Sequence, residues 1–432
     1  MLNSLNGLSF DQLQVLEAIR NGRNVFITGH AGTGKSYLLK CIRDLYYGKG
    51  LHITASTGIA AVQIGGHTLH SWAGLGNGQA NVEYLIDYIL SGKGTYVRRK
   101  IKNCKMLAID EISMLPGDIF NKLNTVLKAV KNSPKPFGGI QLILSGDFFQ
   151  LPPVTKDNET PIFCFETRAW QEGQITTFCL QKIFRHSEQL FIDFLSNLRK
   201  GRLNDNDVAL IKSRTITRPN NITPTFLATH NYQIEQINNT HLKSLSSKSF
   251  IYEMSSQGDE KKSEFLANNC IAPKVLELKI GALVMMLKNN YYKDGIINGS
   301  IGKIIDFVAE DSYHLPVVKF NNGVVKVIGF DSWNYEEFDL TTLKPLVKAS
   351  IIQLPLNLAW AVTIHKSQGM TLDHIECDLS KTFASGQTYV AISRVKNLEG
   401  LFLKNFSTRY IQPNKKALLF EENNFTWQEE FV

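Results

Sequence analysis

Short apolar runs alternate with helical patterns over roughly the first 170 residues. Leu13, Leu16 and Ile19 repeat at the spacing of one helix face, and an apolar run follows within a few residues. Runs of this kind predict buried strands at residues 25–27, 106–109 and 140–144. Strands that alternate with helices are typical of an α/β unit with a parallel sheet.

The same alternation restarts after about residue 170. Leu190, Phe194 and Leu198 predict an amphipathic helix, and residues 225–228 predict a strand with a polar exit. Further along, residues 358–394 return to the α/β pattern. We therefore predict two α/β halves.

The stretch that interrupts the second half has a different pattern. Residues 254–265 are polar and rich in turn formers, which predicts a boundary or an exposed excursion. From about residue 275 to 350, short β-like runs are separated by asparagine and glycine turns such as Asn298-Gly299. This pattern predicts a small antiparallel barrel inserted into the second half.

A glycine-rich segment, residues 29–36 with the sequence GHAGTGKS, joins the first strand to a helix start. Strand, glycine-rich loop and helix is the arrangement of a phosphate-binding P-loop. The glycines let backbone N–H groups curl around the phosphates, Lys35 would reach the β- and γ-oxygens, and Ser36 would ligate Mg²⁺. The segment predicts binding of a nucleoside triphosphate. Its candidate ligands are Gly29, Ala31, Gly32, Thr33, Gly34, Lys35, Ser36 and Tyr37.

Polar residues also follow the other two strands of the first half. Asp110 and Glu111 come directly after the second apolar run, where Asp110 can hold Mg²⁺ through water and Glu111 can orient and deprotonate the attacking water. Gln150 follows the third run and is placed to sense the γ-phosphate or the water. Phe148 and Phe149 beside it fit either a core or a surface on which bases stack.

Three further side chains are candidates for the nucleotide. Gln12, shortly upstream of the first strand, can offer a donor and an acceptor to the edge of adenine, although a surface glutamine is the commoner finding. Arg185 and Arg394 stand at the start and the end of the second half, and they are candidates for the charge that stabilises the transition state at the γ-phosphate. Each arginine alone also fits a surface salt bridge.

Composition describes an ordinary globular chain, with 43% hydrophobic and 20% charged residues and no apolar run near the ~20 residues of a membrane span. No targeting pattern is seen, and the 6 cysteines are scattered without a C-x-x-C pair. We therefore expect a cytoplasmic protein that has no membrane partner. The formal net charge of +8 favours a polyanionic partner, whereas the densest basic stretch, residues 98–105, fits a solvated surface.

An ordered set of motifs resembles that of a known helicase family. The motifs lie at residues 29–36, 55–61, 110–114, 146–153, 184–185, 361–373 and 389–394. They resemble the Pif family, the petite-integration-frequency group of superfamily 1 class B, close to the RecD-like helicases. The resemblance covers nearly the whole chain. In its lack of long terminal extensions, the sequence resembles a bacterial or viral member of the family.

The resemblance implies an α/β fold of two RecA-like P-loop domains with parallel sheets, plus a small wedge insertion and an SH3-like β-barrel insertion. The expected bounds are 1–170 for the first core, 62–82 for the wedge within it, 171–262 and 350–432 for the second core, and 263–349 for the SH3-like insertion. A signature helix would lie between residues 112 and 132, with Asp118, Phe120 and Lys122 in matching places.

The resemblance also implies an activity, which is ATP-driven translocation of a monomer along single-stranded DNA with 5′-to-3′ polarity. Its cofactors would be ATP and Mg²⁺, and its substrates forked duplexes, RNA–DNA hybrids and G-quadruplexes. By motif position, the ATPase site would comprise Gln12, Lys35, Ser36, Asp110, Glu111, Gln150, Arg185, Gly369 and Arg394. The DNA path would be lined by Thr57, Gly58, His70, Ser71, Asn231, Thr363, His365 and Lys366.

Two positions depart from the family pattern. His30 stands where proline is usual in the P-loop, and His186 stands where glutamine is common after Phe184-Arg185. Two other functions stay open. One is an ATP-driven translocase that strips bound proteins from DNA, and the other is the ATPase arm of a recombination or nuclease complex, whose nuclease a separate partner would supply.

Overall fold

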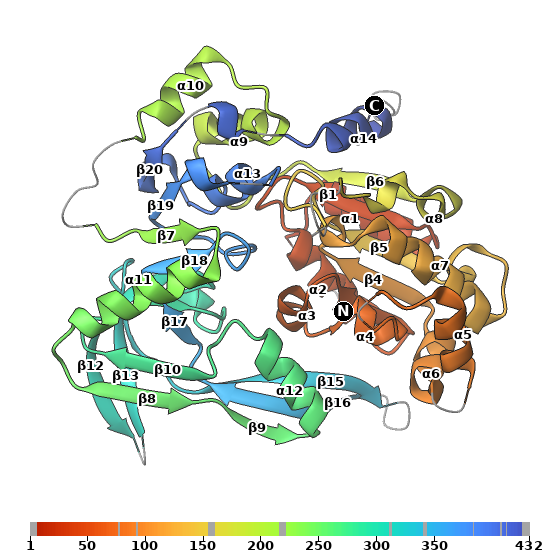
Figure 1. Cartoon of the computed structure of the whole chain (residues 1–432), viewed down its shortest axis with the longest axis horizontal. Coiled ribbons are helices and arrows are strands. Elements are labelled where there is room, and N and C mark those ends of the chain that lie inside the picture. The colour runs from red at the N-terminus through yellow and green to blue at the C-terminus, as the bar shows by residue number, and fades with distance from the viewer. Residues whose placement is uncertain are drawn as a thin grey trace. The chain divides into compact units, whose positions relative to one another are not determined.

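The computed structural model describes residues 7–425, except residues 77, 92–93, 154–159, 216–221, 311–312, 340–343, 383, 407 and 412. The chain divides into two compact units. The first comprises Met1–Phe184, Glu336–Leu346 and Asn414–Val432, and the second comprises Arg185–Tyr335 and Val347–Pro413. Figure 1 labels most of the elements of both units.

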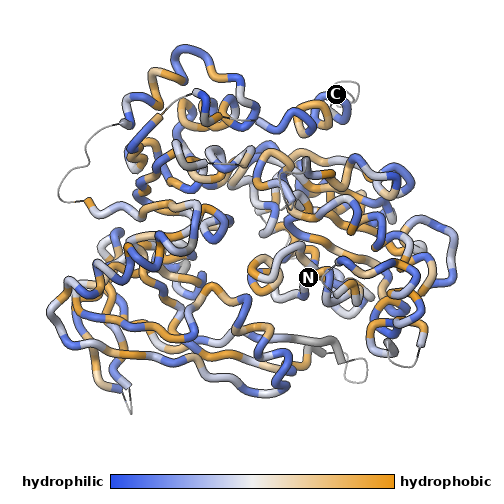
Figure 2. The backbone as a smooth tube through the Cα atoms, viewed as in Figure 1, coloured by the Kyte–Doolittle hydropathy of each residue, from blue (hydrophilic) through white to orange (hydrophobic). Residues whose placement is uncertain are grey.

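A six-stranded sheet forms the centre of the first unit. Its strands are β1 Val25–Gly29, β2 Leu51–Ala55, β3 His67–Thr68, β4 Met106–Asp110, β5 Gln141–Ser145 and β6 Thr176–Leu180. They follow the order β3-β2-β4-β5-β1-β6, and every pair runs parallel. β1 and β4 are buried along their whole length, and Figure 2 shows hydrophobic stretches along the central strands. The three strands predicted from apolar runs, and the α/β class, are confirmed.

Helices lie on both faces of this sheet. They are α1 Phe10–Arg20, α2 Lys35–Leu45, α3 Gly58–Gln63, α4 Leu69–Ala73, α5 Val82–Leu90, α6 Thr95–Asn103, α7 Gly117–Lys131, α8 Arg168–Glu172 and α14 Lys415–Phe425. Phe26 packs in one hydrophobic cluster with Phe120 of α7, whereas Val25 and Ile27 pack in another with Leu38 of α2. Successive side chains of a strand point to opposite faces, so β1 lies between two helical layers.

The first unit extends beyond the boundary expected at residue 170. β6 pairs with β1 up to Gly29↔Leu180, so the chain leaves this sheet only after Leu180. The C-terminal helix α14 also belongs here, since Ala417 is buried in the same cluster as Phe26. Strand pairing and long-range packing thus place residues 171–184 and α14 with the first unit, whereas the domain bounds expected from the resemblance stay predictions.

A four-stranded sheet forms the α/β part of the second unit. Its strands are β7 Thr225–Ala228, β18 Ala361–Thr363, β19 Ile375–Asp378 and β20 Leu401–Asn405, all parallel and in the order β18-β7-β19-β20. Its helices are α9 Gln189–Lys200, α10 Asp205–Lys212, α11 Asn231–Ser244 and α13 Gln387–Ile392. The predicted helix around Phe194 and the predicted strand at 225–228 are confirmed as α9 and β7. None of the described helices of either unit has the length and apolar character that a membrane crossing requires.

Antiparallel strands occupy the middle of the second unit. One sheet joins β14 Val325–Val327, β13 Tyr313–Phe320, β12 Ile301–Glu310, β11 Leu283–Met286 and β17 Leu356–Leu358 in that order. Smaller sheets pair β8 Ser249–Glu253 with β10 Val275–Lys279, and β9 Ser255–Gly258 with β16 Lys344–Gln353 and β15 Asp331–Asp339. The end of β15 from Glu336 and the start of β16 up to Leu346 count with the first unit. The predicted antiparallel runs are confirmed, whereas the closed SH3-like barrel and the wedge stay predictions. The polar stretch 254–265 is largely exposed, as expected, but it forms β9 and the start of α12 Glu260–Asn269.

Asn238 on α11 forms hydrogen bonds with the backbone of β18, the strand at one edge of the second unit's parallel sheet. Its amide nitrogen donates to the Ala361 carbonyl at 3.0 Å, and its amide oxygen accepts from the Ala361 N–H at 3.0 Å. The side chain thus stands in for a strand partner of β18. We expect Asn238→Ala to lower the free energy of unfolding by about 1–3 kcal/mol, because a backbone N–H and C=O are left unpaired.

Urea denaturation measures this loss. The matched control is Asn239→Ala, whose side chain is exposed on the same helix and whose effect should stay within about 0.5 kcal/mol. An equal loss in both variants would contradict the role given to Asn238.

Candidate active site

The loop between β1 and α2 has the geometry of a P-loop. Gly29, Gly32 and Gly34 have φ of 143°, 85° and 83°, in the left-handed region that favours glycine. A Cβ on Gly29 would lie 2.6 Å from the carbonyl oxygen of Leu180, so a side chain has no room there. α2 begins at Lys35, and its first N–H groups therefore border the loop. The predicted strand, glycine loop and helix are present.

Lys35 folds back over this loop. Its ammonium group donates to the carbonyl oxygens of Gly29 at 2.8 Å and of His30 at 2.9 Å. Thr33 Oγ1 also donates to the His30 carbonyl, at 2.9 Å. The histidine in place of proline therefore takes part in the loop through its backbone. A cation and a helix N-terminus at one loop form an anion-binding arrangement.

Gln12 and Phe184 flank the P-loop. Gln12 is 1% exposed, donates from Nε2 to the Thr33 carbonyl at 3.4 Å and accepts from the Ser9 N–H at 3.0 Å, so it is no surface glutamine. Phe184 donates from its N–H to the Gly32 carbonyl at 2.8 Å and keeps its side chain 51% exposed. Sequence reasoning gave Phe184 no role of its own. An exposed ring beside the loop offers a face on which a purine can stack.

The paired carboxylates lie at the end of β4. Burial raises the pKa of Asp110, against the opposing effects of the Ser145 hydroxyl, the Glu111 N–H at 3.0 Å and the charge of Lys35. Glu111 has φ of 51°, a left-handed conformation that is uncommon outside glycine and concentrates at functional sites. Ser56 Oγ donates to the Glu111 carbonyl at 2.7 Å and so helps to hold this conformation.

The turn after β5 carries Gln150. Its Nε2 donates to Asp147 Oδ2 at 3.2 Å, while Asp147 Oδ1 accepts from the Phe149 N–H at 3.2 Å. Phe148 and Phe149 are 3% and 4% exposed and lie in the core, which excludes the alternative of base stacking. Asp147, which sequence reasoning gave no role, therefore fixes the orientation of the glutamine.

These groups come from neighbouring strand ends. In a parallel sheet the carboxyl ends share one edge, and the order β4-β5-β1 brings Asp110, the Gln150 turn and the P-loop next to one another. The donor set fits Mg²⁺, which prefers oxygen ligands, because Ser36 offers a hydroxyl and Asp110 a carboxylate whose raised pKa a cation would lower. Of the other loop candidates, Ala31 is buried and Tyr37 is 52% exposed on the first turn of α2.

The two candidate arginines lie close together within the second unit. Arg185 donates to the carbonyl oxygens of Ser393 at 3.2 Å and Gly369 at 3.4 Å. Arg394 is 2% exposed and donates from Nε to the Val390 carbonyl at 2.9 Å, so it is not a surface residue. Burial, followed by the neighbouring charge of Arg394, lowers the pKa of Arg185 to about 9. Two adjacent guanidinium groups favour a polyanion.

His186, the second departure from the family pattern, supports this pair. It is 5% exposed, and its Nδ1 lies 3.0 Å from the Lys396 carbonyl oxygen. Burial lowers the pKa of His186 to about 4, so the ring is neutral near pH 7 and donates from Nδ1. The residue therefore ties the segment that carries Arg185 to the turn that follows Arg394.

The candidate DNA-path residues of the first unit lie at two short helices. Thr57 Oγ1 accepts a backbone N–H at 3.3 Å and caps α3, which begins at Gly58. His70 and Ser71 lie on α4, with Ser71 exposed. β2 pairs with β4 in parallel, so Thr57 and Gly58 leave the sheet at the same edge as Asp110.

The candidates of the second unit lie at two adjacent strand ends. β18 pairs with β7 in parallel as far as Thr363↔Ala228, which brings the exits of both strands together. Thr363 Oγ1 accepts the Lys366 N–H at 3.0 Å, and His365 is half-buried, which lowers its pKa. Asn231 opens α11 beyond β7, and its side chain lies outside the described residues.

α7 occupies the place of the expected signature helix. Lys122 Nζ donates to the Gly78 carbonyl at 2.6 Å. Burial lowers the pKa of His70, and the nearby charge of Asp118 opposes this effect. Phe120 is fully buried in the core. Lys122 therefore contacts the segment 62–82, of which residue 77 lies outside the described chain.

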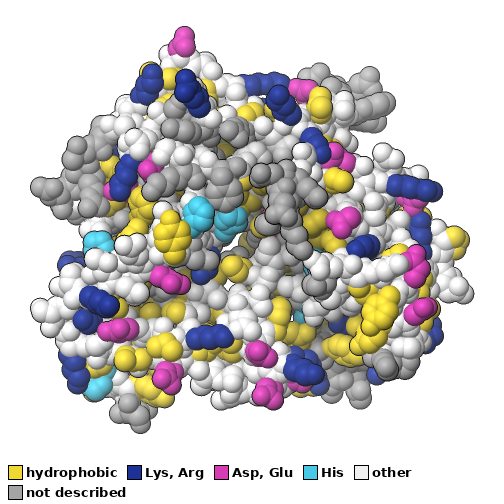
Figure 3. All heavy atoms as spheres, viewed as in Figure 1, with side chains coloured by type: hydrophobic (Ala, Val, Ile, Leu, Met, Phe, Trp, Pro, Cys, Tyr) yellow, Lys and Arg dark blue, Asp and Glu magenta, His cyan; other side chains and the backbone are white. Residues whose placement is uncertain are grey.

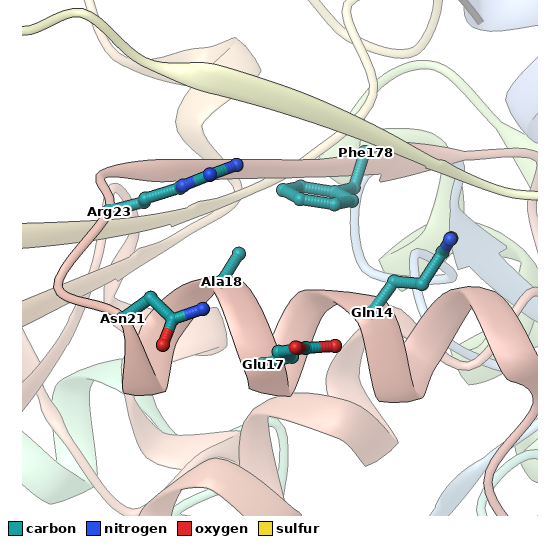
Figure 4. A pocket seen from close by; sticks show the side chains of 6 residues that line it. All are labelled: Gln14, Glu17, Ala18, Asn21, Arg23 and Phe178. Atoms are coloured by element: carbon teal, nitrogen blue, oxygen red, sulfur yellow. The ribbon is translucent and has the colours of Figure 1, made fainter. Parts of the chain in front are cut away.

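Two other surface features are separate from these groups. A pocket of about 290 Å³ between α1 and β6 is lined by Gln14, Glu17, Ala18, Asn21, Arg23 and Phe178 (Figure 4). It contains none of the candidate site residues.

The basic stretch 98–105 begins on α6, where Lys100 Nζ lies 4.6 Å from the centre of the Tyr96 ring. Figure 3 shows lysine and arginine side chains spread over the visible face among acidic ones, as in an ordinary solvated surface.

The parallel sheet, the P-loop and the carboxylates at the next strand ends define a P-loop nucleotide-binding protein. A family model described as PIF1-like helicase matches residues 7–209, and one described as DNA helicase Pif1, 2B domain matches residues 263–307. The chain belongs to the PIF1-like helicase family.

Its relatives are similar over most of this chain. The ATP-dependent DNA helicase PIF1 of Homo sapiens is 42% identical over 416 residues, which are 96% of this chain and 63% of the relative. The chain thus spans less than two thirds of that relative. Bacteroides sp Pif1 in complex with ADP-AlF4 is 32% identical, with a TM-score of 0.86 over 98% of both chains. Pif1 helicase from Bacteroides in complex with ADP-AlF3 and ssDNA is 32% identical, with a TM-score of 0.64 over 98% of both chains.

His52 on β2 supports α4 and leads to a prediction about pH. Trp72 Nε1 donates to His52 Nδ1 at 3.1 Å, so this nitrogen carries no proton. Burial, with the charge of Lys100 adding to it, lowers the pKa of His52 from 6.5 to about 4. Below about pH 6.5 the unfolded chain therefore binds a proton that the folded protein does not. As the pH is lowered from about 6.5 to 4, the free energy of unfolding should decrease, and at pH 5 it should be about 2 kcal/mol smaller than at neutral pH.

Urea denaturation at pH 7.5 and at pH 5 measures the effect. His52→Asn should remove this part of the pH dependence, while the separate contribution of His186 remains. A variant that loses as much stability as the parent on acidification would refute the assignment.

Proposed function

We propose that this chain is an ATP-dependent DNA helicase that moves 5′ to 3′ along single-stranded DNA. The observation that carries the proposal is the P-loop with Asp110, Glu111 and Gln150 at neighbouring strand ends. A relative named ATP-dependent DNA helicase and neighbours titled as complexes with ADP-AlF4 and with ssDNA support it. Its substrates would be forked duplexes, RNA–DNA hybrids and G-quadruplexes, and it would act as a cytoplasmic monomer.

The first unit would bind the triphosphate and activate water. Lys35, which donates to two loop carbonyls, would exchange them for charged phosphate oxygens, which accept stronger hydrogen bonds. Glu111 would orient the attacking water and take its proton. Gln150, oriented by Asp147, would contact the γ-phosphate or that water. Gln12 and Phe184 would contact the adenine.

The second unit would supply positive charge. Arg185 and Arg394 would stabilise the γ-phosphoryl group as it is transferred, with Gly369 accepting from Arg185. Ser36 and Asp110 would hold Mg²⁺, whose charge neutralises the β- and γ-phosphate oxygens when it is bound.

The single strand would be held at strand ends and helix starts of both units. In the first unit its contacts would be Thr57, Gly58, His70 and Ser71, and in the second Asn231, Thr363, His365 and Lys366. Hydroxyl groups, backbone N–H groups and a lysine at such positions bind phosphates without reading sequence. Contacts of this type would let one strand slide through during cycles of hydrolysis.

The experiment that tests the proposal uses two partial duplexes, one with a 5′ single-stranded tail and one with a 3′ tail. We expect ATP-dependent strand separation of the 5′-tailed substrate alone. Separation of the 3′-tailed substrate alone would overturn the polarity and the assigned DNA contacts. DNA-stimulated hydrolysis without any separation would favour the protein-stripping translocase.

Lys35→Ala isolates the nucleotide step. Because the phosphate charge loses its cation, kcat for DNA-stimulated ATP hydrolysis should fall by about 100-fold or more, and unwinding should stop. Lys49→Ala, an exposed lysine shortly after α2, is the matched control and should keep parental rates. Unwinding by Lys35→Ala at the parental rate would show that Lys35 is wrongly assigned.

A further inference from the structure

The C-terminal helix α14 is built into the core of the first unit. The chain enters α14 after β20 of the second unit, and Asn414 Oδ1 caps the helix by accepting from the Lys416 N–H at 3.0 Å. Lys416 Nζ forms an ion pair with Glu166 at 2.8 Å and donates to the Pro161 carbonyl at 3.1 Å. Ala417 is 1% exposed. The helix is thus fixed at its start by a cap, an ion pair and a buried side chain.

Phe420 of α14 completes a group of aromatic rings. Its ring stacks on Phe165 with the centres 4.5 Å apart, and it meets Phe148 edge-on at 5.4 Å and Trp170 at 5.8 Å. The ring of Phe26 on β1 lies 6.1 Å away. Stacked and edge-to-face rings at these separations attract one another beyond the effect of burial alone.

Phe148 links this group to the active-site turn. Its ring contacts four other rings besides that of Phe420, and the side chain is 3% exposed. Its backbone lies between Asp147 and Phe149, the two residues whose hydrogen bond shapes the turn. Gln150 comes next and is oriented by the same aspartate. A shift of the Phe148 ring would therefore move the aspartate–glutamine pair.

We propose that Phe420 is a positioning residue for ATP hydrolysis. It touches neither nucleotide nor water, and it acts by holding Phe148, and through it the Asp147–Gln150 turn, in one arrangement. The inference rests on the proposed function, in which Gln150 meets the γ-phosphate or the attacking water. The helix α14, far from the P-loop in sequence, is then part of the support of the hydrolytic site.

This role predicts a specific kinetic effect. The groups that bind the triphosphate belong to the loop after β1. Phe26 of β1 keeps its ring contacts with Phe148 at 5.0 Å and with Trp170 at 5.4 Å when Phe420 is removed. Nucleotide affinity should therefore change little. Phe148 loses one of the five rings that hold it, which loosens the turn with Gln150, so the step at the γ-phosphate should slow.

The test compares Phe420→Ala with Leu418→Ala in the full chain. Leu418 packs against the same core from the same helix but has no ring to place against Phe148. Both variants should unfold at a lower temperature than the parent. Only Phe420→Ala should lower kcat of DNA-stimulated hydrolysis, by about 10- to 100-fold, the loss that a misplacement of about 1 Å produces. Its KM for ATP and its affinity for ADP should stay within about twofold of the parent values, because the P-loop contacts stabilise the ground state and the transition state equally and are unchanged in this variant.

Phe420→Tyr keeps the ring and should restore kcat. Parental kcat in Phe420→Ala would overturn the proposal, and so would equal losses of kcat in Phe420→Ala and Leu418→Ala, which would show a merely structural effect. A parent chain without DNA-stimulated hydrolysis would instead refute the proposed function itself. The two failures are therefore distinguishable in one set of assays.

Discussion

The pairing of β6 with β1 up to Gly29 and Leu180 is the constraint on which the nucleotide site depends. Only glycine allows it, because a Cβ at position 29 would lie 2.6 Å from the Leu180 carbonyl oxygen. Pairing to the very end of the strand carries the chain alongside the P-loop, where the Phe184 N–H reaches the Gly32 carbonyl at 2.8 Å. The loop, its neighbouring strand and the exposed ring thus form one assembly, and the second unit begins at the next residue, Arg185.

The central part of the site was predictable from sequence for a physical reason. The P-loop and Asp110 lie at the ends of buried strands, Gln150 lies in the turn after β5, and a parallel sheet brings such strand ends to a common edge whatever their distance along the chain. Local patterns were therefore sufficient to find them. The roles of Asp147 and Phe184 were not predictable in this way, because they depend on a turn conformation and on a strand pairing.

Local patterns do not reveal how far each unit extends, for a related reason. β6 is an edge strand, and its apolar pattern would be the same as the last strand of the first sheet or as the first strand of the second sheet. Only its pairing with β1 shows that it belongs to the first sheet. α14 shows an ordinary helical pattern, and nothing in it reveals that Phe420 packs against Phe148 from an earlier part of the chain. Turn patterns likewise predicted the antiparallel strands, whereas the pair Val284↔Leu358 at one edge of their sheet joins strands far apart in sequence.

Both units hold their candidate cations by the same device. Lys35 donates to the carbonyl oxygens of Gly29 and His30, and Arg185 donates to those of Gly369 and Ser393. Each cation is thus oriented by neutral acceptors, so little side-chain entropy remains to be lost when a phosphate binds. An anionic oxygen is a stronger acceptor than a carbonyl, roughly twofold in hydrogen-bond strength. In the proposed function, exchange of one acceptor for the other would therefore favour the phosphate-bound state, and the carbonyls would keep the cations in position between cycles of hydrolysis.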